Sequence, residues 1–359
     1  MTGQPWLLTR KHPPSVGGMQ LLSFELVQGL KAIRPAQVLA WGRGQWGLPL
    51  FFIYAFARLV PALVRGRVSV LHLGDPVLAA LAWLPRLFRV PVAVTVHGLD
   101  ISFPSPIYQA YLRLCFWGRM QAYVCISRHV RDRVLAAGMA DEQVVVIPLG
   151  VGELEVAGPE PQLQEVLDTQ SPVLLSLGRL VERKGLHWFL REVAPGFFSR
   201  HPNARLLIAG EGPIRAALEA EIARAGLDAN VLLLGAVSES RKAWLLQRCD
   251  LVVMPNIEVA GDAEGFGLVA LEAGRAGRWV LVSDLEGLRD AVAQDCNGER
   301  LPAADAQAWS EALDRDCADL PALRERGSQA RDYVQRQFSW AAMAARYDRL
   351  FRVLEADAA

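Results

Sequence analysis

LVVM at Leu251–Met254, followed by EGFGLVALEA at Glu264–Ala273, is the stretch that decides the fold of this chain. The first run is short and apolar, as in a buried strand, and the second passes from a glycine-rich turn into a run of helix formers. Glycines in such a turn let the backbone approach a ligand closely, and the amides at a helix start attract phosphate or another anion. The pattern therefore predicts a strand–turn–helix unit with a ligand at its turn.

Two glutamates, Glu264 and Glu272, flank this turn. One precedes the predicted helix and the other lies about two turns along it. They place an acceptor group at each end of a bound, hydroxyl-rich molecule, and a diphosphate that joins a sugar to a ribose would fit this layout. A capping acid followed by an ordinary exposed helix residue is the alternative interpretation.

Length and composition indicate a two-domain globular protein. The chain has 359 residues, of which 52% are hydrophobic and 21% charged, and its formal net charge is zero. Such a chain is too long for one ordinary core and too apolar to be disordered. The balanced charge gives no support for a broadly basic nucleic-acid surface, so we expect no nucleic-acid partner.

Cysteine usage and the N-terminus indicate a reducing compartment. The five cysteines are scattered, show no CxxC spacing and form no cluster with histidine, as expected of free thiols. The N-terminus lacks a basic region followed by an apolar one, so we expect no signal peptide and a cytoplasmic protein. Trp46–Val64 is strongly apolar but contains Pro49, Arg58 and Pro61. It is interpreted as a half-buried helix or, alternatively, as a face that rests on a membrane surface, which would place the protein at the inner face of the cytoplasmic membrane.

Strand-like and helix-like runs alternate throughout, which predicts an α/β fold with parallel sheets. The predicted strands include Val68–Leu73, Val92–Val96 and Val173–Leu177, and the predicted helical stretches include Val77–Phe88 and Leu186–Phe198. The alternation stops over Gly150–Pro172, a linker-like segment rich in glycine and proline, and then restarts. We expect two doubly wound, Rossmann-like domains, residues 1–155 and 165–338, with a final helix at about 340–356 that packs back on the first domain. Such domains bind ligands at the carboxyl ends of their strands, in a cleft between them.

Three motifs follow predicted strands. Paired glycines, Gly17 and Gly18, precede a helix. Their backbone amides would face an anion, or the pair forms a simple turn. His97 ends a strand and is followed by Asp100, which would orient it or accept from an acceptor hydroxyl. Arg179 and Lys184 project from a loop after a strand and suit a diphosphate, whereas Arg183 between them is interpreted as a solvated surface charge. A further turn, Gly210–Pro213, lacks the third glycine of a dinucleotide fingerprint.

Taken in order, these blocks resemble the retaining glycosyltransferases of family 4, which have the B-type glycosyltransferase fold. The resemblance covers nearly the whole chain and is highly specific as an ordered set. It is carried by Pro13–Gly18, Thr95–Asp100, Cys125–Ser127, Val146–Val151, Gly178–Gly185, Gly210–Pro213 and Pro255–Glu272.

The resemblance implies residue roles. Arg179 and Lys184 would bind the donor diphosphate and stabilise its departure, and Glu272 would accept from the ribose hydroxyls. Glu264 would hold the donor sugar, helped by the amides of Gly265, Phe266 and Gly267. Gly17 and Gly18 would lie against the phosphate or the acceptor, and His97 would contact the transferred sugar. The family needs no metal and no cofactor, because cations and helix amides stabilise the charge. The chain departs from the family pattern at Leu149, at Gly277–Trp279 and at Glu286, an acid where glycine is common.

The sequence therefore predicts a retaining hexosyltransferase that uses a nucleotide-diphosphate sugar, with a slight preference for GDP-mannose. The acceptor is expected to be a glycan or a lipid-linked molecule in the synthesis of cell-surface polysaccharide or glycolipid. A sugar-nucleotide epimerase of similar architecture and a donor-binding protein without catalysis are the alternatives. A dehydrogenase would depend on Gly210–Pro213, which is deficient.

Overall fold

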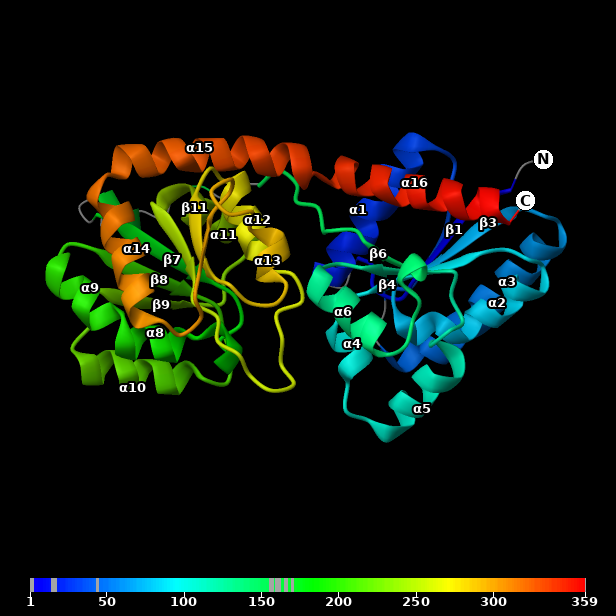
Figure 1. Ribbon diagram of the computed structural model, residues 1–359, viewed down its shortest axis with the longest axis horizontal. Coiled ribbons are helices and arrows are strands. Elements are labelled where there is room, and N and C mark those ends of the chain that lie inside the picture. The colour runs from blue at the N-terminus through cyan, green and yellow to red at the C-terminus, as the bar shows by residue number, and fades with distance from the viewer. Residues whose placement is uncertain are drawn as a thin grey trace. The chain divides into compact units, whose positions relative to one another are not determined.

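The computed structural model describes residues 3–13, 18–42, 45–154, 158, 163–164, 167–168 and 171–358. Gly17 and part of the predicted linker Gly150–Pro172 lie outside these residues. The chain divides into two compact units, which are described one at a time (Figure 1). Unit 1 contains Met1–Gly150 and Ser339–Ala359, and unit 2 contains Val151–Phe338.

Unit 1 is built on a parallel six-stranded sheet with the strand order β2-β1-β3-β4-β5-β6. Its strands are β1 (Gln4–Thr9), β2 (Gln37–Ala40), β3 (Val68–Leu73), β4 (Val92–Val96), β5 (Ala122–Cys125) and β6 (Val144–Val146). The helices are α1 (Gly18–Ile33), α2 (Leu48–Val64), α3 (Trp83–Leu87), α4 (Leu99–Ser102), α5 (Pro106–Cys115), α6 (Arg128–Ala136) and α16 (Trp340–Asp357), with 3-10 turns η1 (Gln45–Gly47), η2 (Pro76–Ala82) and η3 (Asp141–Gln143).

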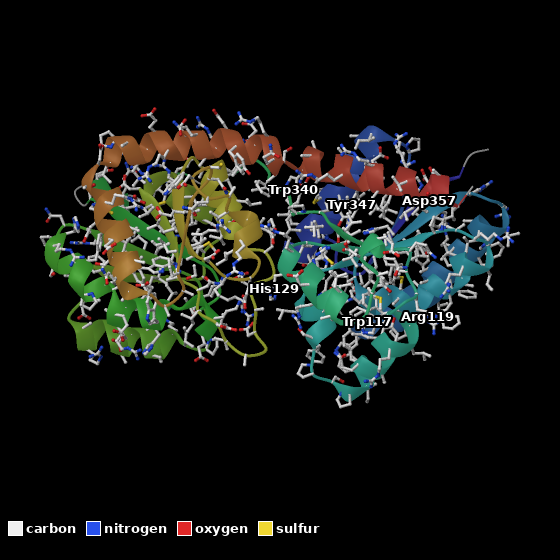
Figure 2. All side chains as sticks on the ribbon, in the orientation of Figure 1. Trp117, Arg119, His129, Trp340, Tyr347 and Asp357 are labelled. Atoms are coloured by element: carbon white, nitrogen blue, oxygen red, sulfur yellow. The ribbon has the colours of Figure 1, made fainter. Side chains whose placement is uncertain are left out.

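The C-terminal helix α16 is part of the core of unit 1. Its Tyr347 and Phe351 are buried in one cluster with Leu26 and Leu30 of α1. A buried polar chain joins it to the sheet, because the hydroxyl oxygens of Tyr347 and Thr95 lie 2.9 Å apart. The Thr95 hydroxyl also lies 2.9 Å from Nε2 of His72. Tyr347 is labelled on α16 in Figure 2. The unit therefore depends on a segment that follows unit 2 in the sequence.

Unit 2 has a second parallel six-stranded sheet, with the order β12-β11-β10-β7-β8-β9. Its strands are β7 (Val173–Leu177), β8 (Arg205–Ala209), β9 (Val231–Gly235), β10 (Leu251–Met254), β11 (Trp279–Ser283) and β12 (Glu299–Leu301). The helical segments are η4 (Glu182–Lys184), α8 (Leu186–Glu192), α9 (Ala194–Arg200), α10 (Arg215–Ala225), α11 (Glu239–Arg248), α12 (Leu268–Arg275), α13 (Leu288–Ala291), α14 (Ala306–Ala318) and α15 (Leu320–Gln337).

The two parallel sheets confirm the predicted doubly wound α/β class. Strands covered on both faces appear as near-continuous apolar runs, which is why the sequence located them well. Two predicted helical stretches are helical in the structure but are not continuous α-helices. The predicted helix at Val77–Phe88 is a 3-10 turn as far as Ala82 and α-helical only beyond it. The predicted helix at Leu186–Phe198 is interrupted at Val193, because Pro195 has no amide hydrogen to continue the ladder and instead lies in the first turn of α9.

Candidate active site

The loops that follow β7 and β10 meet because these parallel strands are neighbours in the sheet. The amide of Ile257 donates to the carbonyl oxygen of Arg183 at 2.9 Å. Gly185 has φ +66°, and a Cβ placed on it would lie 1.8 Å from the carbonyl oxygen of Pro255. Only glycine fits there, since any side chain would push the two loops apart. Local sequence therefore fixes the spacing of the two loops that carry the predicted donor-binding residues.

Lys184 and Glu264 form a direct ion pair between these loops. Lys184 Nζ lies 2.5 Å from Oε2 of Glu264, and each side chain is 13% exposed. The side-chain amide of Asn256 donates to the same oxygen at 3.3 Å. Burial acts to raise the pKa of Glu264, but Lys184, Arg183 and Asn256 outweigh it, so the pKa lies below its ordinary value. Glu264 is therefore a carboxylate at neutral pH, able to accept hydrogen bonds from hydroxyl groups and unable to donate one.

The interpretation of Arg183 as a solvated surface charge is wrong. Its side chain is 11% exposed, and Nη1 lies 2.8 Å from Oδ1 of Asp262. Its Nε lies 3.7 Å from Oε2 of Glu264, so Arg183 is a second cation beside that carboxylate. The sequence carried a signal for the Arg183–Asp262 pair. The segment between Met254 and Glu264 contains two acids, and the loop after β7 contains three cations.

Arg179 differs from its two neighbours. Its side chain is exposed and forms no hydrogen bond or ion pair with any residue that the structure describes, while its carbonyl oxygen accepts from the amide of Val181 at 3.0 Å. The backbone beneath it is tightly packed, because a Cβ on Gly210 would lie 1.8 Å from the carbonyl oxygen of Gly178. Arg179 thus extends from a rigid loop with its guanidinium available for an anion.

The start of α12 presents backbone rather than side chains to this loop pair. Gly267 has φ +86° and precedes the helix. Phe266 is buried, with its ring 6.4 Å from that of Phe338, so its amide and not its ring is the group to consider for a ligand. Gly265, Phe266 and Gly267 accordingly form the glycine-rich turn expected from the sequence.

Glu272 is buried on α12 and is paired with a residue that the sequence analysis missed. Nζ of Lys242, in the first turns of α11, lies 2.6 Å from Oε1 of Glu272 and 2.6 Å from Oε2 of Glu239. Burial raises the pKa of Glu272, and Lys242 offsets only part of this effect. The sequence signal for this partner is the position of Lys242 near the start of α11, the helix that precedes β10.

Glu286 lies beside Glu264. Its backbone is left-handed, with φ +46°, and its carboxylate accepts a hydrogen bond from the amide of Glu264. The amide of Gly287 donates to the carbonyl oxygen of Glu264 at 3.1 Å. Burial raises the pKa of Glu286, and the charge of Glu264 acts in the same direction. The departure from the family pattern at Glu286 therefore adds an acid next to Glu264.

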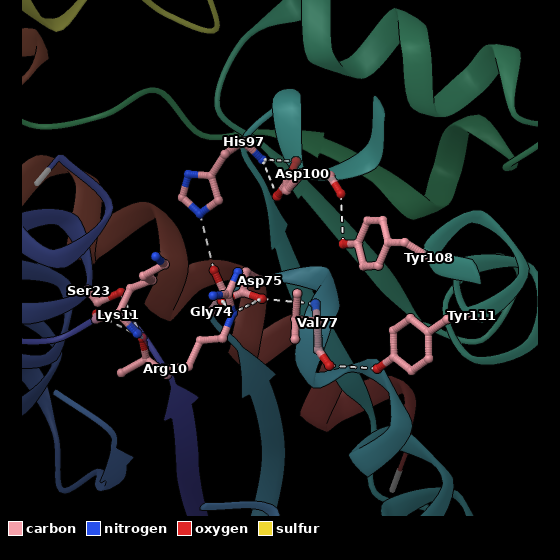
Figure 3. A network of polar contacts seen from close by, with 11 residues as sticks. Arg10, Lys11, Ser23, Gly74, Asp75, Val77, His97, Asp100, Tyr108 and Tyr111 are labelled. Atoms are coloured by element: carbon pink, nitrogen blue, oxygen red, sulfur yellow. Dashed lines mark hydrogen bonds and ion pairs between the residues drawn. The ribbon is translucent and has the colours of Figure 1, made fainter. Parts of the chain in front are cut away.

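In unit 1, His97 and Asp100 are held by backbone groups (Figure 3). The Asp100 carboxylate accepts from the amides of His97 at 2.9 Å and Gly98 at 2.8 Å. The imidazole of His97 has Nε2 3.1 Å from the carbonyl oxygen of Gly74. Asp100 thus fixes the loop, while the Gly74 carbonyl orients the ring. Burial raises the pKa of Asp100, although the nearby amides and His97 oppose this shift.

The remaining predicted site residues are Gly17 and Gly18. Gly17 is outside the described residues, and Gly18 is the first residue of α1. Among the described residues, no group of three or more histidine, cysteine, aspartate or glutamate side chains has the arrangement of a metal site. Within the described residues, the structure brings two pairs of predicted site residues into direct contact, Lys184 with Glu264 through their side chains and His97 with Asp100 through the His97 amide.

Comparison with known proteins identifies the family of this chain. The family model "Glycosyltransferase Family 4" matches residues 7–152, and "Glycosyl transferases group 1" matches residues 161–332. The chain belongs to glycosyltransferase family 4. It is 30% identical over 295 residues to a phosphatidyl-myo-inositol mannosyltransferase of Mycobacterium leprae, a match that spans 81% of this chain and 75% of the relative.

Solved structures show that this family 4 glycosyltransferase has the B-type fold. HepE of Anabaena in complex with UDP is similar with a TM-score of 0.73 and 18% identity, covering 98% of this chain and 100% of HepE. HepE has also been solved with UDP-glucose. The sucrose-phosphate synthase of Thermosynechococcus elongatus gives a TM-score of 0.71 at 20% identity, covering 99% of this chain and 100% of that one. The expected enzyme class is thus confirmed: the protein transfers a sugar from a nucleotide-sugar donor.

Proposed function

We propose that this glycosyltransferase moves a hexose from a nucleotide-diphosphate donor, GDP-mannose being the first to test, to a hydroxyl of a glycan or lipid-linked acceptor. The product would serve the synthesis of cell-surface polysaccharide or glycolipid on the cytoplasmic side. The similarity to a mannosyltransferase named for phosphatidyl-myo-inositol supports both mannose and a lipid-linked acceptor. The UDP-glucose bound to HepE makes UDP-glucose the competing donor.

The Lys184–Glu264 pair is the observation that carries this proposal. A buried carboxylate kept ionised by two cations is suited to accept hydrogen bonds from sugar hydroxyls, and it lies one residue from the glycine turn that opens α12. We assign Arg179 and Lys184 to the donor diphosphate, and Glu264, with the amides of Gly265, Phe266 and Gly267, to the sugar. Glu272 is assigned to the ribose.

In the proposed reaction the acceptor hydroxyl oxygen forms a bond to the anomeric carbon while the bond from that carbon to the diphosphate oxygen breaks. The hydroxyl proton passes to the departing diphosphate, and the new bond forms on the face that the diphosphate leaves, so configuration is retained. Arg179 and Lys184 stabilise the negative charge that develops on the leaving group. His97 contacts the transferred sugar, and Gly17 and Gly18 lie against the phosphate or the acceptor.

The first experiment measures thermal stability with GDP-mannose, UDP-glucose and the free nucleotides. A ligand that binds the folded state at a hundred times its Kd adds about 2.7 kcal/mol of stability. The donor so identified is then incubated with and without acceptor, and the anomeric configuration of the product is read by NMR. Retained configuration in a transferred sugar supports the proposal, whereas an inverted product contradicts the mechanism.

The alternatives give different products in the same experiment. An epimerase converts the donor sugar in the absence of acceptor, and a donor-binding protein is stabilised by the donor but yields neither transfer nor hydrolysis.

The variants Lys184→Met and Glu264→Gln test the site assignment. Unchanged turnover in either would contradict the site assignment.

A further inference from the structure

The acidic residues are distributed very unevenly along this chain. Between Glu25 and Asp132 there are only two, Asp75 and Asp100, against twelve basic residues, although the whole chain has 38 of each kind. Neither acid is available at the surface for a counter-charge. Asp75 is fully buried against Arg10, and Asp100 accepts from the amides of its own loop. The stretch between Glu25 and Asp132 therefore has an excess of ten positive charges, of which Arg34 and Arg131 pair with acids from other parts of the chain.

Helix α2 in the same region is apolar on its outward side as well as its inward side. Phe51, Ala55 and Leu59 form its buried stripe. The opposite side, which we call the outer face of α2, consists of Leu50, Ile53, Tyr54, Phe56 and Val64, all at least 48% exposed. Just before the helix, Trp46 is 100% exposed. Apolar side chains on all sides are typical of a helix that is covered all round, yet about half or more of each side chain on the outer face is exposed here.

The outer face of α2 is bordered by cations. Arg58 lies within the helix and Arg65 and Arg67 follow it, and all three are exposed and form no side-chain ion pair with the described residues. Arg67 lines one groove with Arg89, which follows α3, and Glu355 in the same lining pairs with Arg34. Leu87 of α3 is 80% exposed, and the ring of Trp83 in the same helix lies 5.1 Å from the guanidinium carbon of Arg119. Arg119 is labelled in Figure 2. Each helix thus has exposed apolar side chains with arginines at or beside them.

An apolar helix face flanked by arginines is suited to lie in the interface of a lipid bilayer. None of the helices in the described part of the chain has the length and hydropathy of a membrane span. A second copy of this chain is a poor occupant, because pairing these faces would bring two positively charged surfaces together. We propose that unit 1 docks on a bilayer of anionic lipids through the outer face of α2, Trp46 and the exposed residues of α3, with Arg58, Arg65, Arg67 and Arg89 at the headgroups.

The test is flotation of the full chain with two kinds of vesicle, pure phosphatidylcholine and an equimolar mixture of phosphatidylcholine and phosphatidylglycerol. We expect binding to the mixed vesicles, weakened by salt, and little binding to pure phosphatidylcholine. Neither donor nor acceptor is present. A failure of this docking proposal is therefore separate from a failure of the proposed transferase function.

Two pairs of variants locate the surface. Ile53→Glu should weaken binding about tenfold, because it removes an inserted side chain. Arg58→Glu should weaken it by at least about fivefold, the effect of one charge near the surface. The matched controls, Ile33→Glu on α1 and Arg336→Glu on α15, change exposed residues of the same kinds elsewhere and should bind like the unchanged protein.

Several outcomes would overturn the proposal. These are equal binding to both vesicles, no binding to either, or equal losses in the control variants. Dimers that form without lipid and dissociate on Ile53→Glu would assign the face to a second copy instead. Thermal unfolding checks that each variant is folded, and Trp46→Ser, at a fully exposed residue, replaces Ile53→Glu if that variant is not.

Discussion

Replacing Lys184 by methionine should leave Glu264 as a buried carboxylate that has lost its nearest cation. Lys184 Nζ lies 2.5 Å from Glu264, and the two side chains are each 13% exposed. Removing one partner of a buried pair typically costs ~3–5 kcal/mol. Arg183 at 3.7 Å and Asn256 at 3.3 Å remain beside the carboxylate and compensate in part. We therefore expect a loss of about 2–3 kcal/mol in the free energy of unfolding of unit 2, somewhat below that range.

The double-mutant cycle separates this pairing from simple loss of packing. Lys184→Met combined with Glu264→Gln removes both charges, so the double variant should be more stable than the sum of the single effects predicts, by at least about 1 kcal/mol. Arg179→Met is the matched control, because Arg179 is an exposed cation of the same loop without an ion pair to any described residue. It should change stability little while weakening donor binding.

The pH dependence of the stability difference has a definite sign. The folded pKa of Glu264 is below its ordinary value of 4.5, so the pair stabilises the protein fully above pH 4.5 and this contribution is lost as pH falls through the folded pKa. In Lys184→Met the burial effect is left with less opposition, and the pKa of Glu264 rises. The stability difference between the two proteins should thus be largest at neutral pH and shrink in acid. Denaturant unfolding over this pH range measures it, and additive single effects together with a constant difference would refute the reasoning.

Three further predictions concern other parts of the molecule. Gly185→Ala should separate the two donor loops and abolish donor binding, measured by calorimetry, because its Cβ would meet the carbonyl of Pro255 at 1.8 Å. Burial lowers the pKa of His72 from 6.5 to about 3. Unit 1 should therefore lose about 1.4 kcal/mol of stability for each pH unit below 6.5, until the pH reaches the folded pKa. NMR should show a neutral imidazole at pH 5, and titration of His72 with an ordinary pKa would contradict this prediction. Glu272→Gln should raise the KM for the donor about tenfold with a smaller effect on kcat, and equal loss of affinity for a donor analogue without ribose hydroxyls would exclude the assigned contact.

The parallel strands could be predicted from the sequence because each is an apolar run buried on both faces. Val68–Leu73, Val92–Val96 and Val173–Leu177 have the same bounds in the sequence analysis and in the structure. The short edge strand Glu299–Leu301 was missed, since two of its three residues are charged. Helix type was harder, because a run such as Pro76–Ala82 has the composition of a helix but forms 3-10 turns.

Pairings between distant residues were the least predictable part of the site. The residues of the donor loops followed from motifs and from resemblance, but their charge partners did not. Arg183 and Asp262 are 79 residues apart, and Lys242 and Glu272 are 30 apart, so neither pair follows a local pattern. What brings each pair together is strand order, which places β7 beside β10, and the packing of α11 and α12. The sequence showed that suitable charges were present in these segments, but which of them pair followed only from the topology.

The two glutamates of the opening motif are buried to a similar extent, yet their pKa values move in opposite directions. Glu264 has two cations beside it, Lys184 and Arg183, and its pKa is lowered. Glu272 shares its one cation, Lys242, with Glu239, and its pKa is raised. A diphosphate bound near Lys184 would add negative charge beside Glu264 and so weaken the stabilisation of its carboxylate by Lys184 and Arg183. Arg179, exposed and without an ion-pair partner in the described chain, is then the group that must neutralise the donor, so we expect donor affinity to depend on Arg179 more steeply than the stability of the free protein does.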